Sequence, residues 1–131
     1  QILNLLKELQ ENMGLTYIFI THDLSVVNYF SDDILVMYLG KMMEKAPSEK
    51  LFDNPLHPYT KALLSAIPIP SIHNRPERII LPGEITSPID PPEGCRFAQR
   101  CAYCTDKCLR ETPPYVEAEP DHFVACHLCQ G

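Results

Sequence analysis

The sequence has 131 residues, which suits one ordinary domain or a small domain with part of another. Its net charge of −6 does not give the basic surface of nucleic-acid-binding domains, so we expect no nucleic-acid partner. No apolar run approaches the roughly 20 residues that cross a bilayer. Residues 1–10 carry charge and helical periodicity, unlike a signal peptide.

The N-terminal residues predict an amphipathic helix over 1–13. Its apolar residues recur three and four positions apart, on one face: Ile2, Leu5, Leu6 and Leu9. Gly14 follows as a C-terminal stop. The helical pattern begins without a cap, and we therefore expect the chain to be a fragment of a longer protein.

Short strands and helices are predicted to alternate after this helix. Residues 15–21 (LTYIFIT) form an apolar, β-branched and aromatic run, typical of a buried strand in a parallel sheet. A helix over 24–30, strands over 34–38 and 41–45, and two further helices follow, the second from Pro58 to about Ala66. The expected fold class is α/β with a partial parallel sheet.

The composition changes near residue 67. Ten of the 13 prolines and all six cysteines come after that point. We expect two parts: 1–67, and an irregular Cys/Pro-rich extension over 68–131. An extension this short and proline-rich has only a small hydrophobic core. It would need cross-links (staples) such as disulfides or a bound metal, and the cysteines are candidates for these.

His22 and Asp23 come directly after the predicted strand 15–21. In open α/β sheets, ligands collect beyond the carboxyl ends of strands, so His22 is either a phosphate-binding residue or simply a cap at a turn. The segment 18–24 (IFITHDL) resembles the switch-histidine segment of ABC ATPases, and 34–41 resembles the next strand and turn of that fold. This resemblance implies that His22 contacts the γ-phosphate of ATP and helps align the attacking water, with Asp23 in a supporting role.

Most of an ATP site is missing from this sequence. There is no G-x-x-x-x-G-K-[ST] phosphate loop, ABC signature or glutamine loop. Phosphoryl transfer needs the phosphate cradle, Mg²⁺ and a positioned nucleophile together. We therefore expect ATP and Mg²⁺ to bind the longer parent, and this chain alone to be inactive as an ATPase.

Residues 54–64 (NPLHPYTKALL) point to a subfamily. Taken alone, they predict a helix start with His57 near the N-cap. They closely resemble the start of the C-terminal extension in oligopeptide and dipeptide ABC ATPases. That resemblance implies a peripheral subunit on the cytoplasmic side of the cell membrane that energises peptide import. Its implied partners are a second ATP-binding subunit, the membrane-spanning permease subunits and, indirectly, a peptide-binding receptor.

The cysteines allow two metal-binding sets. By spacing, Cys101-x-x-Cys104 and Cys126-x-x-Cys129 suit tetrahedral zinc. By resemblance, the extension of peptide-transporter ATPases carries four cysteines associated with a [4Fe–4S] cluster, which implies the ligands Cys95, Cys101, Cys108 and Cys126. We favour the iron–sulfur set, with zinc second and structural disulfides third.

Two further expectations follow from the cysteines and the predicted sheet. The alternative to a transporter subunit is a free-standing iron–sulfur or zinc module with a redox or regulatory role. Within a transporter subunit, a cluster is expected to act mainly as a staple for the weak core of the extension. Because an incomplete parallel sheet exposes an edge, we also expect the fragment to form a dimer or a domain-swapped assembly.

Overall fold

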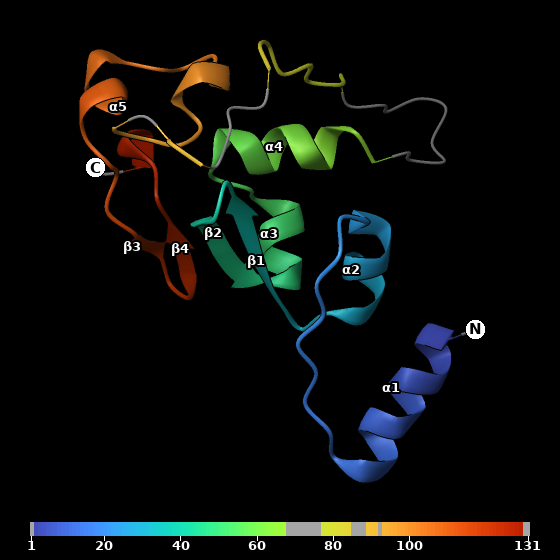
Figure 1. The fold of residues 1–131 in the computed structure, drawn as a ribbon. Coiled ribbons are helices and arrows are strands. Elements are labelled where there is room, and N and C mark those ends of the chain that lie inside the picture. Colours follow the sequence, from blue (N-terminus) through green and yellow to red (C-terminus); the bar gives the residue numbers. More distant parts are fainter. Residues whose placement is uncertain (1, 68–76, 85–88, 92, 130–131) are drawn as a thin grey trace.

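Two hairpins from distant parts of the sequence join into one four-stranded sheet with the order β1-β2-β4-β3 (Figure 1). The computed structural model describes residues 2–67, 77–84, 89–91 and 93–129. Every neighbouring pair of strands is antiparallel. The strands are β1 (Asp33–Tyr38), β2 (Lys41–Pro47), β3 (Val116–Glu119) and β4 (His122–Val124).

A two-residue turn at Leu39-Gly40 closes the first hairpin. Both residues have positive φ, 46° and 77°, which is the backbone of the turn that matches the twist of paired strands. The register shifts between Val36 and Met37, so that Met43 is an extra residue on β2. This bulge lets Met43 and Glu44, adjacent in sequence, both be buried.

Two short helices cover the β1–β2 hairpin. Helix α3 (Ser48–Asp53) packs on β1 and β2, and α4 (Pro58–Ser65) begins with Pro58 just after its N-cap, His57. A proline in the first turn loses no hydrogen bond, because that N–H has no partner inside the helix. The apolar core between them has four buried members: Ile34, Val36, Ala46 and Leu51.

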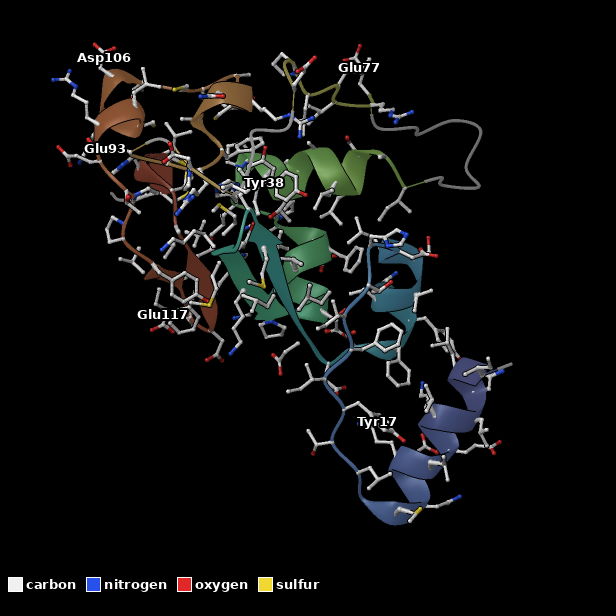
Figure 2. The ribbon with its side chains drawn as sticks, in the orientation of Figure 1. Tyr17, Tyr38, Glu77, Glu93, Asp106 and Glu117 are labelled. Atoms are coloured by element: carbon white, nitrogen blue, oxygen red, sulfur yellow. The ribbon has the colours of Figure 1, made fainter. Side chains whose placement is uncertain are left out.

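A second core group is aromatic and joins the first hairpin to the C-terminal half. The rings of Tyr38 and Phe97 meet edge to face with centroids 5.4 Å apart, and Tyr59 packs against both. Figure 2 shows Tyr38 where the sheet, α4 and the C-terminal segments meet. Phe97 is only 1% exposed, so it anchors the loop that carries Cys95 and Cys101.

In its described residues, the C-terminal half contains three short helical turns besides its hairpin. They are the 3₁₀ turn η1 (Ala98–Arg100), helix α5 (Asp106–Arg110) and the 3₁₀ turn η2 (His127–Cys129). The expected boundary after residue 67 falls beside 68–76, which lie outside the described residues. None of the described helices is both long and apolar enough to cross a membrane.

The N-terminal helices form as predicted. Helix α1 (Ile2–Met13) ends at Gly14, whose φ is +66° and whose N–H bonds to the Gln10 carbonyl at 3.0 Å. Helix α2 (Leu24–Phe30) is capped by Asp23, which accepts from the Ser25 N–H. Figure 1 shows α1 well apart from the sheet, and none of its residues is buried.

The expected parallel sheet is wrong. Strands predicted over 34–38 and 41–45 are present as β1 and β2, but they form an antiparallel hairpin. Residues 15–21 form no strand, and Ile18 and Ile20 are each 94% exposed. A strand exists only through hydrogen bonds to a neighbour, and no described strand pairs with this segment.

Candidate functional site

Four cysteines from three separate segments line one small cavity. Cys95 and Cys101 come from the loop around Phe97, Cys108 from α5, and Cys126 from the residues after β4. His57, Pro58 and His127 contribute to the same walls, with Phe97 and Ala98 as apolar lining. The cavity therefore lies where the start of α4 meets the C-terminal segments.

A close backbone approach holds Cys95 beside α5. The Cys95 N–H donates to the Cys108 carbonyl at 2.7 Å. Gly94 makes this possible, because its φ is +90° and a Cβ there would lie 2.4 Å from that carbonyl oxygen. The glycine before Cys95 is thus required by geometry.

The thiols around the cavity influence one another electrostatically. Burial, together with smaller contributions from the neighbouring Cys108, Cys126 and Cys101, raises the pKa of Cys95 to about 11, against a lowering effect of a hydrogen bond with the Phe97 backbone. Burial likewise raises the pKa of Cys101, with smaller contributions from Cys126, Cys104 and Cys108, against a lowering effect of a hydrogen bond with the Tyr103 backbone. Without a cation these thiols favour their neutral form, and a bound cation would reverse that preference.

The other two cysteines do not line this cavity. Cys104 lies between Cys101 and Cys108 in the sequence. Its thiol donates to the Thr105 carbonyl at 3.6 Å. Cys129 donates to the Leu56 carbonyl at 3.9 Å, and burial followed by the charge of Cys126 raises its pKa to about 11. The cavity therefore gathers the set implied by the resemblance rather than the two C-x-x-C pairs.

All six cysteines are free thiols in the structure. Among residues 2–67, 77–84, 89–91 and 93–129, no group of three or more His, Cys, Asp or Glu side chains is arranged so that it could hold a metal ion as it stands. The four thiols nevertheless line one cavity.

His57 connects this cavity to the sheet. Its Nδ1 accepts the Tyr59 N–H at 3.0 Å, and its own backbone N–H donates to Glu44 Oε2 at 2.9 Å. Burial lowers the pKa of His57 to about 4, against a smaller opposing effect of the Glu44 charge. The imidazole is therefore neutral near pH 7.

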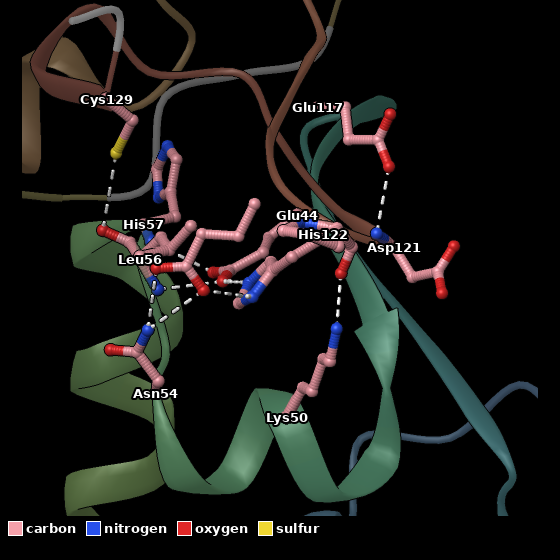
Figure 3. A network of polar contacts seen from close by, with 11 residues as sticks. Glu44, Lys50, Asn54, Leu56, His57, Glu117, Asp121, His122 and Cys129 are labelled. Carbon is pink, nitrogen blue, oxygen red and sulfur yellow. Dashed lines mark hydrogen bonds and ion pairs between the residues drawn. The ribbon is translucent and has the colours of Figure 1, made fainter.

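Glu44 and His122 form a buried polar network that the sequence analysis missed (Figure 3). Glu44 Oε1 accepts from His122 Nε2 at 2.5 Å and from the Leu56 N–H at 2.8 Å. Both side chains are fully buried. Alternation along β2 could not have revealed Glu44, because the bulge at Met43 breaks that alternation.

The structure places His22 on the surface, away from the cysteine cavity. It is exposed in the bend before α2, and the cap of that helix is Asp23 rather than His22. Since residues 15–21 are not a strand here, His22 does not stand at the end of one. The placement expected for His22 is not formed in this chain.

The relatives of this chain are transport proteins. Residues 43–108, about half of the chain, match the family described as "Oligopeptide/dipeptide transporter, C-terminal region". The oligopeptide transport ATP-binding protein AppF of Bacillus subtilis (strain 168) is 54% identical over 130 residues, which are 98% of this chain and 40% of that protein. The putative oligopeptide transport ATP-binding protein YkfD of the same organism is 55% identical with the same coverage.

A relative from a second organism gives the same result. The dipeptide transport ATP-binding protein DppF of Haemophilus influenzae (strain ATCC 51907 / DSM 11121 / KW20 / Rd) is 54% identical over 127 residues, 96% of this chain and 38% of that protein. The chain thus spans about 40% of the length of the curated relatives it matches. By the family match and by these identities, the chain belongs to the oligopeptide/dipeptide transporter C-terminal region family.

Proposed function

We propose that this chain is the C-terminal part of an ATP-binding subunit that energises import of oligopeptides or dipeptides. The observation that carries the proposal is the match of 98% of the chain to 40% of an oligopeptide transport ATP-binding protein at 54% identity. The remaining part of the subunit supplies the phosphate loop and the Mg²⁺ site for ATP. The relatives' names give no support to a free-standing metal-binding module.

In the whole subunit, residues 15–21 pair with a neighbouring strand. Ile18 and Ile20, both 94% exposed here, then become buried on that sheet. Pairing brings His22 to the end of a strand, where its imidazole contacts the γ-phosphate and helps align water. Asp23 caps α2 and fixes the turn that carries His22.

The test of this role is ATP hydrolysis by the intact subunit assembled with its permease. His22→Ala should lower kcat at least about 100-fold, the usual effect of losing one positioned group at the transition state. ATP affinity should change little, because the phosphate loop and Mg²⁺ provide most of it. Asp32→Ala, an exposed carboxylate outside this turn, is the matched control. Unchanged kcat in His22→Ala contradicts the assignment.

The partners follow from the same proposal. The subunit works with a second ATP-binding subunit against membrane-spanning permease subunits, on the cytoplasmic side of the membrane, while a peptide-binding receptor acts indirectly. Residues 1–67 comprise the C-terminal part of the nucleotide-binding domain and the start of the extension, and 68–131 form the Cys/Pro-rich extension. The extension adds stability through its sheet strand β4, which pairs with β2.

We also propose that Cys95, Cys101, Cys108 and Cys126 hold an iron–sulfur cluster that staples the extension. The donor set fits in kind and number, because four thiols line one cavity with apolar walls. The cavity gathers these four thiols and leaves out Cys104 and Cys129, which the spacing assigns to tetrahedral zinc. That supports the iron–sulfur set, since a [4Fe–4S] cluster needs four thiolates, which can come from loops of irregular spacing.

When bound, the cluster supplies four bonds that cross-link the three segments of the cavity wall. The chain's own part is to hold the thiols in place: Gly94 brings Cys95 to α5, and Phe97 anchors the loop between Cys95 and Cys101. The cluster would thereby replace apolar core that the extension lacks.

The test is iron, sulfide and zinc content after anaerobic purification of the full-length subunit. Serine substitution at Cys95, Cys101, Cys108 or Cys126 should abolish the visible absorbance and bound iron. Cys104→Ser and Cys129→Ser are matched controls and should retain both. Loss of bound metal in Cys104→Ser and Cys129→Ser, with retention in Cys95→Ser and Cys108→Ser, would favour the zinc-type spacing and reverse the assignment.

A further inference from the structure

The imidazole of His57 is fixed on one side by the start of α4 and faces the thiol cavity on the other. Its Nδ1 accepts the Tyr59 N–H at 3.0 Å, as an N-cap side chain does. Its backbone N–H is held by Glu44 Oε2 at 2.9 Å, and its ring packs at 5.6 Å on Phe97. The residue is 1% exposed, so its orientation is locked by packing.

These contacts settle which ring nitrogen carries the proton. Because Nδ1 accepts a hydrogen bond from a backbone N–H, it has no proton of its own, and the neutral ring carries its proton on Nε2. His57 lines the cavity together with all four thiols of the proposed cluster. Figure 3 shows its ring pointing away from Glu44, toward the segment that carries Cys129.

We propose that His57 is a positioning residue for the cysteine cavity, whose Nε2–H donates a hydrogen bond to a cysteine sulfur of the bound group. This inference rests on the iron–sulfur proposal above. Capping α4 needs only an acceptor, which asparagine would supply equally well. The imidazole adds a donor at its far edge, and the ring lines the same cavity as the four thiols.

A donor in this position has a defined effect on the bound group. Hydrogen bonds to cluster sulfurs stabilise negative charge and raise the reduction potential. They also compensate for burying thiolate charge among apolar side chains. His57 therefore links the start of α4 to the redox state of the extension.

A second histidine provides a matched comparison within the same cavity. His127 also lines it, but its Nε2 lies 2.9 Å from the Glu111 carbonyl oxygen and donates there. Its Nδ1 is buried without a hydrogen-bond partner among the described residues and is left without a proton. His127 therefore has no free N–H for a thiolate, although it also lines the cavity and follows Cys126 directly in the sequence.

The experiment compares three variants of the full-length subunit, purified anaerobically. His57→Asn keeps the helix cap and removes the Nε2–H donor. His57→Gln restores an N–H near the position of Nε2. His127→Asn is the control. Iron and sulfide are assayed first, and reduction potentials are then measured by a dye-linked titration. Thermal unfolding of the variants checks that the fold is kept.

His57→Asn should shift the ratio of reduced to oxidised cluster about tenfold toward oxidised, which is about 59 mV for one electron. His57→Gln and His127→Asn should stay near the wild type. If the wild type contains the cluster and His57→Asn has the same reduction potential, the role of His57 is wrong, while the iron–sulfur proposal stands. A wild type without iron and sulfide overturns the iron–sulfur proposal and this inference with it.

Discussion

Glu44 and His122 lie 78 residues apart in sequence and meet at 2.5 Å, with both side chains fully buried. Their pairing joins β2 of the first hairpin to β4 of the second, beside the backbone pairing of the same strands. Glu44 also accepts the N–H groups of Leu56 and His57. One carboxylate therefore holds the C-terminal hairpin and the start of α4 to the sheet.

Removing this carboxylate should destabilise the whole chain. Glu44→Ala leaves His122 and two backbone N–H groups buried without an acceptor, at a cost of about 3 kcal/mol or more. Glu49→Ala, an exposed glutamate on the neighbouring helix α3, should change the free energy of unfolding by less than about 0.5 kcal/mol. Urea unfolding measures both variants, and equal effects would show that the network does not join the two hairpins.

The sequence predicted elements whose information is local. Helices over 2–13, 24–30 and 58–65 and the strands of the first hairpin follow from apolar spacing, Gly14, Pro58 and the Leu39-Gly40 turn. It did not predict the sheet, because pairing of β2 with β4 depends on residues about 80 positions apart. The strand expected over 15–21 also failed, since apolar composition alone supplies no hydrogen-bonding neighbour.

The cysteine site was predictable in part for the same reason. Spacing alone left two sets open, and only the fold brings Cys95, Cys101, Cys108 and Cys126 to one cavity. His57 was expected near an N-cap, which is confirmed, but its position between Glu44 and the thiols depends on distant contacts. Glu44 and His122 carry no motif, so nothing in the sequence indicated their pairing.

Substituting Gly94 should separate the two sides of the cysteine cavity. In Gly94→Ala, the new Cβ would lie 2.4 Å from the Cys108 carbonyl oxygen at a backbone φ of +90°. Gly40→Ala is the matched control, because its φ is +77° but no atom lies within 4 Å of the added Cβ. Gly40→Ala should cost about 1–2 kcal/mol for the left-handed backbone alone.

Gly94→Ala should exceed that cost, because the clash is with backbone and cannot be relieved by a side chain. It should also abolish iron binding in the full-length subunit, whereas Gly40→Ala should not. Thermal or urea unfolding and iron content together measure the effect. Equal losses in the two variants would mean that the contact between Gly94 and Cys108 is unimportant.

The lowered pKa of His57 predicts a specific pH dependence of stability. The pKa is about 4 in the folded protein and 6.5 in the unfolded chain, so the unfolded state binds the extra proton between these values. The contribution is complete above pH 6.5 and is lost as the pH falls toward 4. Between pH 7.5 and pH 5 the free energy of unfolding should fall by about 2 kcal/mol from this group.

His57→Asn has no titrating group at this position and isolates the effect. The difference between wild type and variant should shrink by about that amount between pH 7.5 and pH 5, whatever the other histidines contribute. Urea unfolding at the two pH values provides the measurement. Parallel pH profiles would contradict the buried, neutral state of His57.

The exposed segment 15–21 predicts self-association of this chain and protection in the whole subunit. Ile18 and Ile20 present apolar side chains beside unpaired backbone, which invites pairing with a second copy. The 131-residue chain should therefore form dimers at high concentration in light scattering, and Ile18→Lys should restore the monomer. Because Ile18 is 94% exposed, this variant should change the chain's own stability by less than about 0.5 kcal/mol.

In the full-length subunit the same variant should cost about 2 kcal/mol or more, since the strand is then buried. Ile2→Lys, on the exposed face of α1, is the matched control for added charge. A monomeric wild-type chain, or rapid hydrogen exchange of residues 15–21 in the full-length subunit, would contradict this pairing.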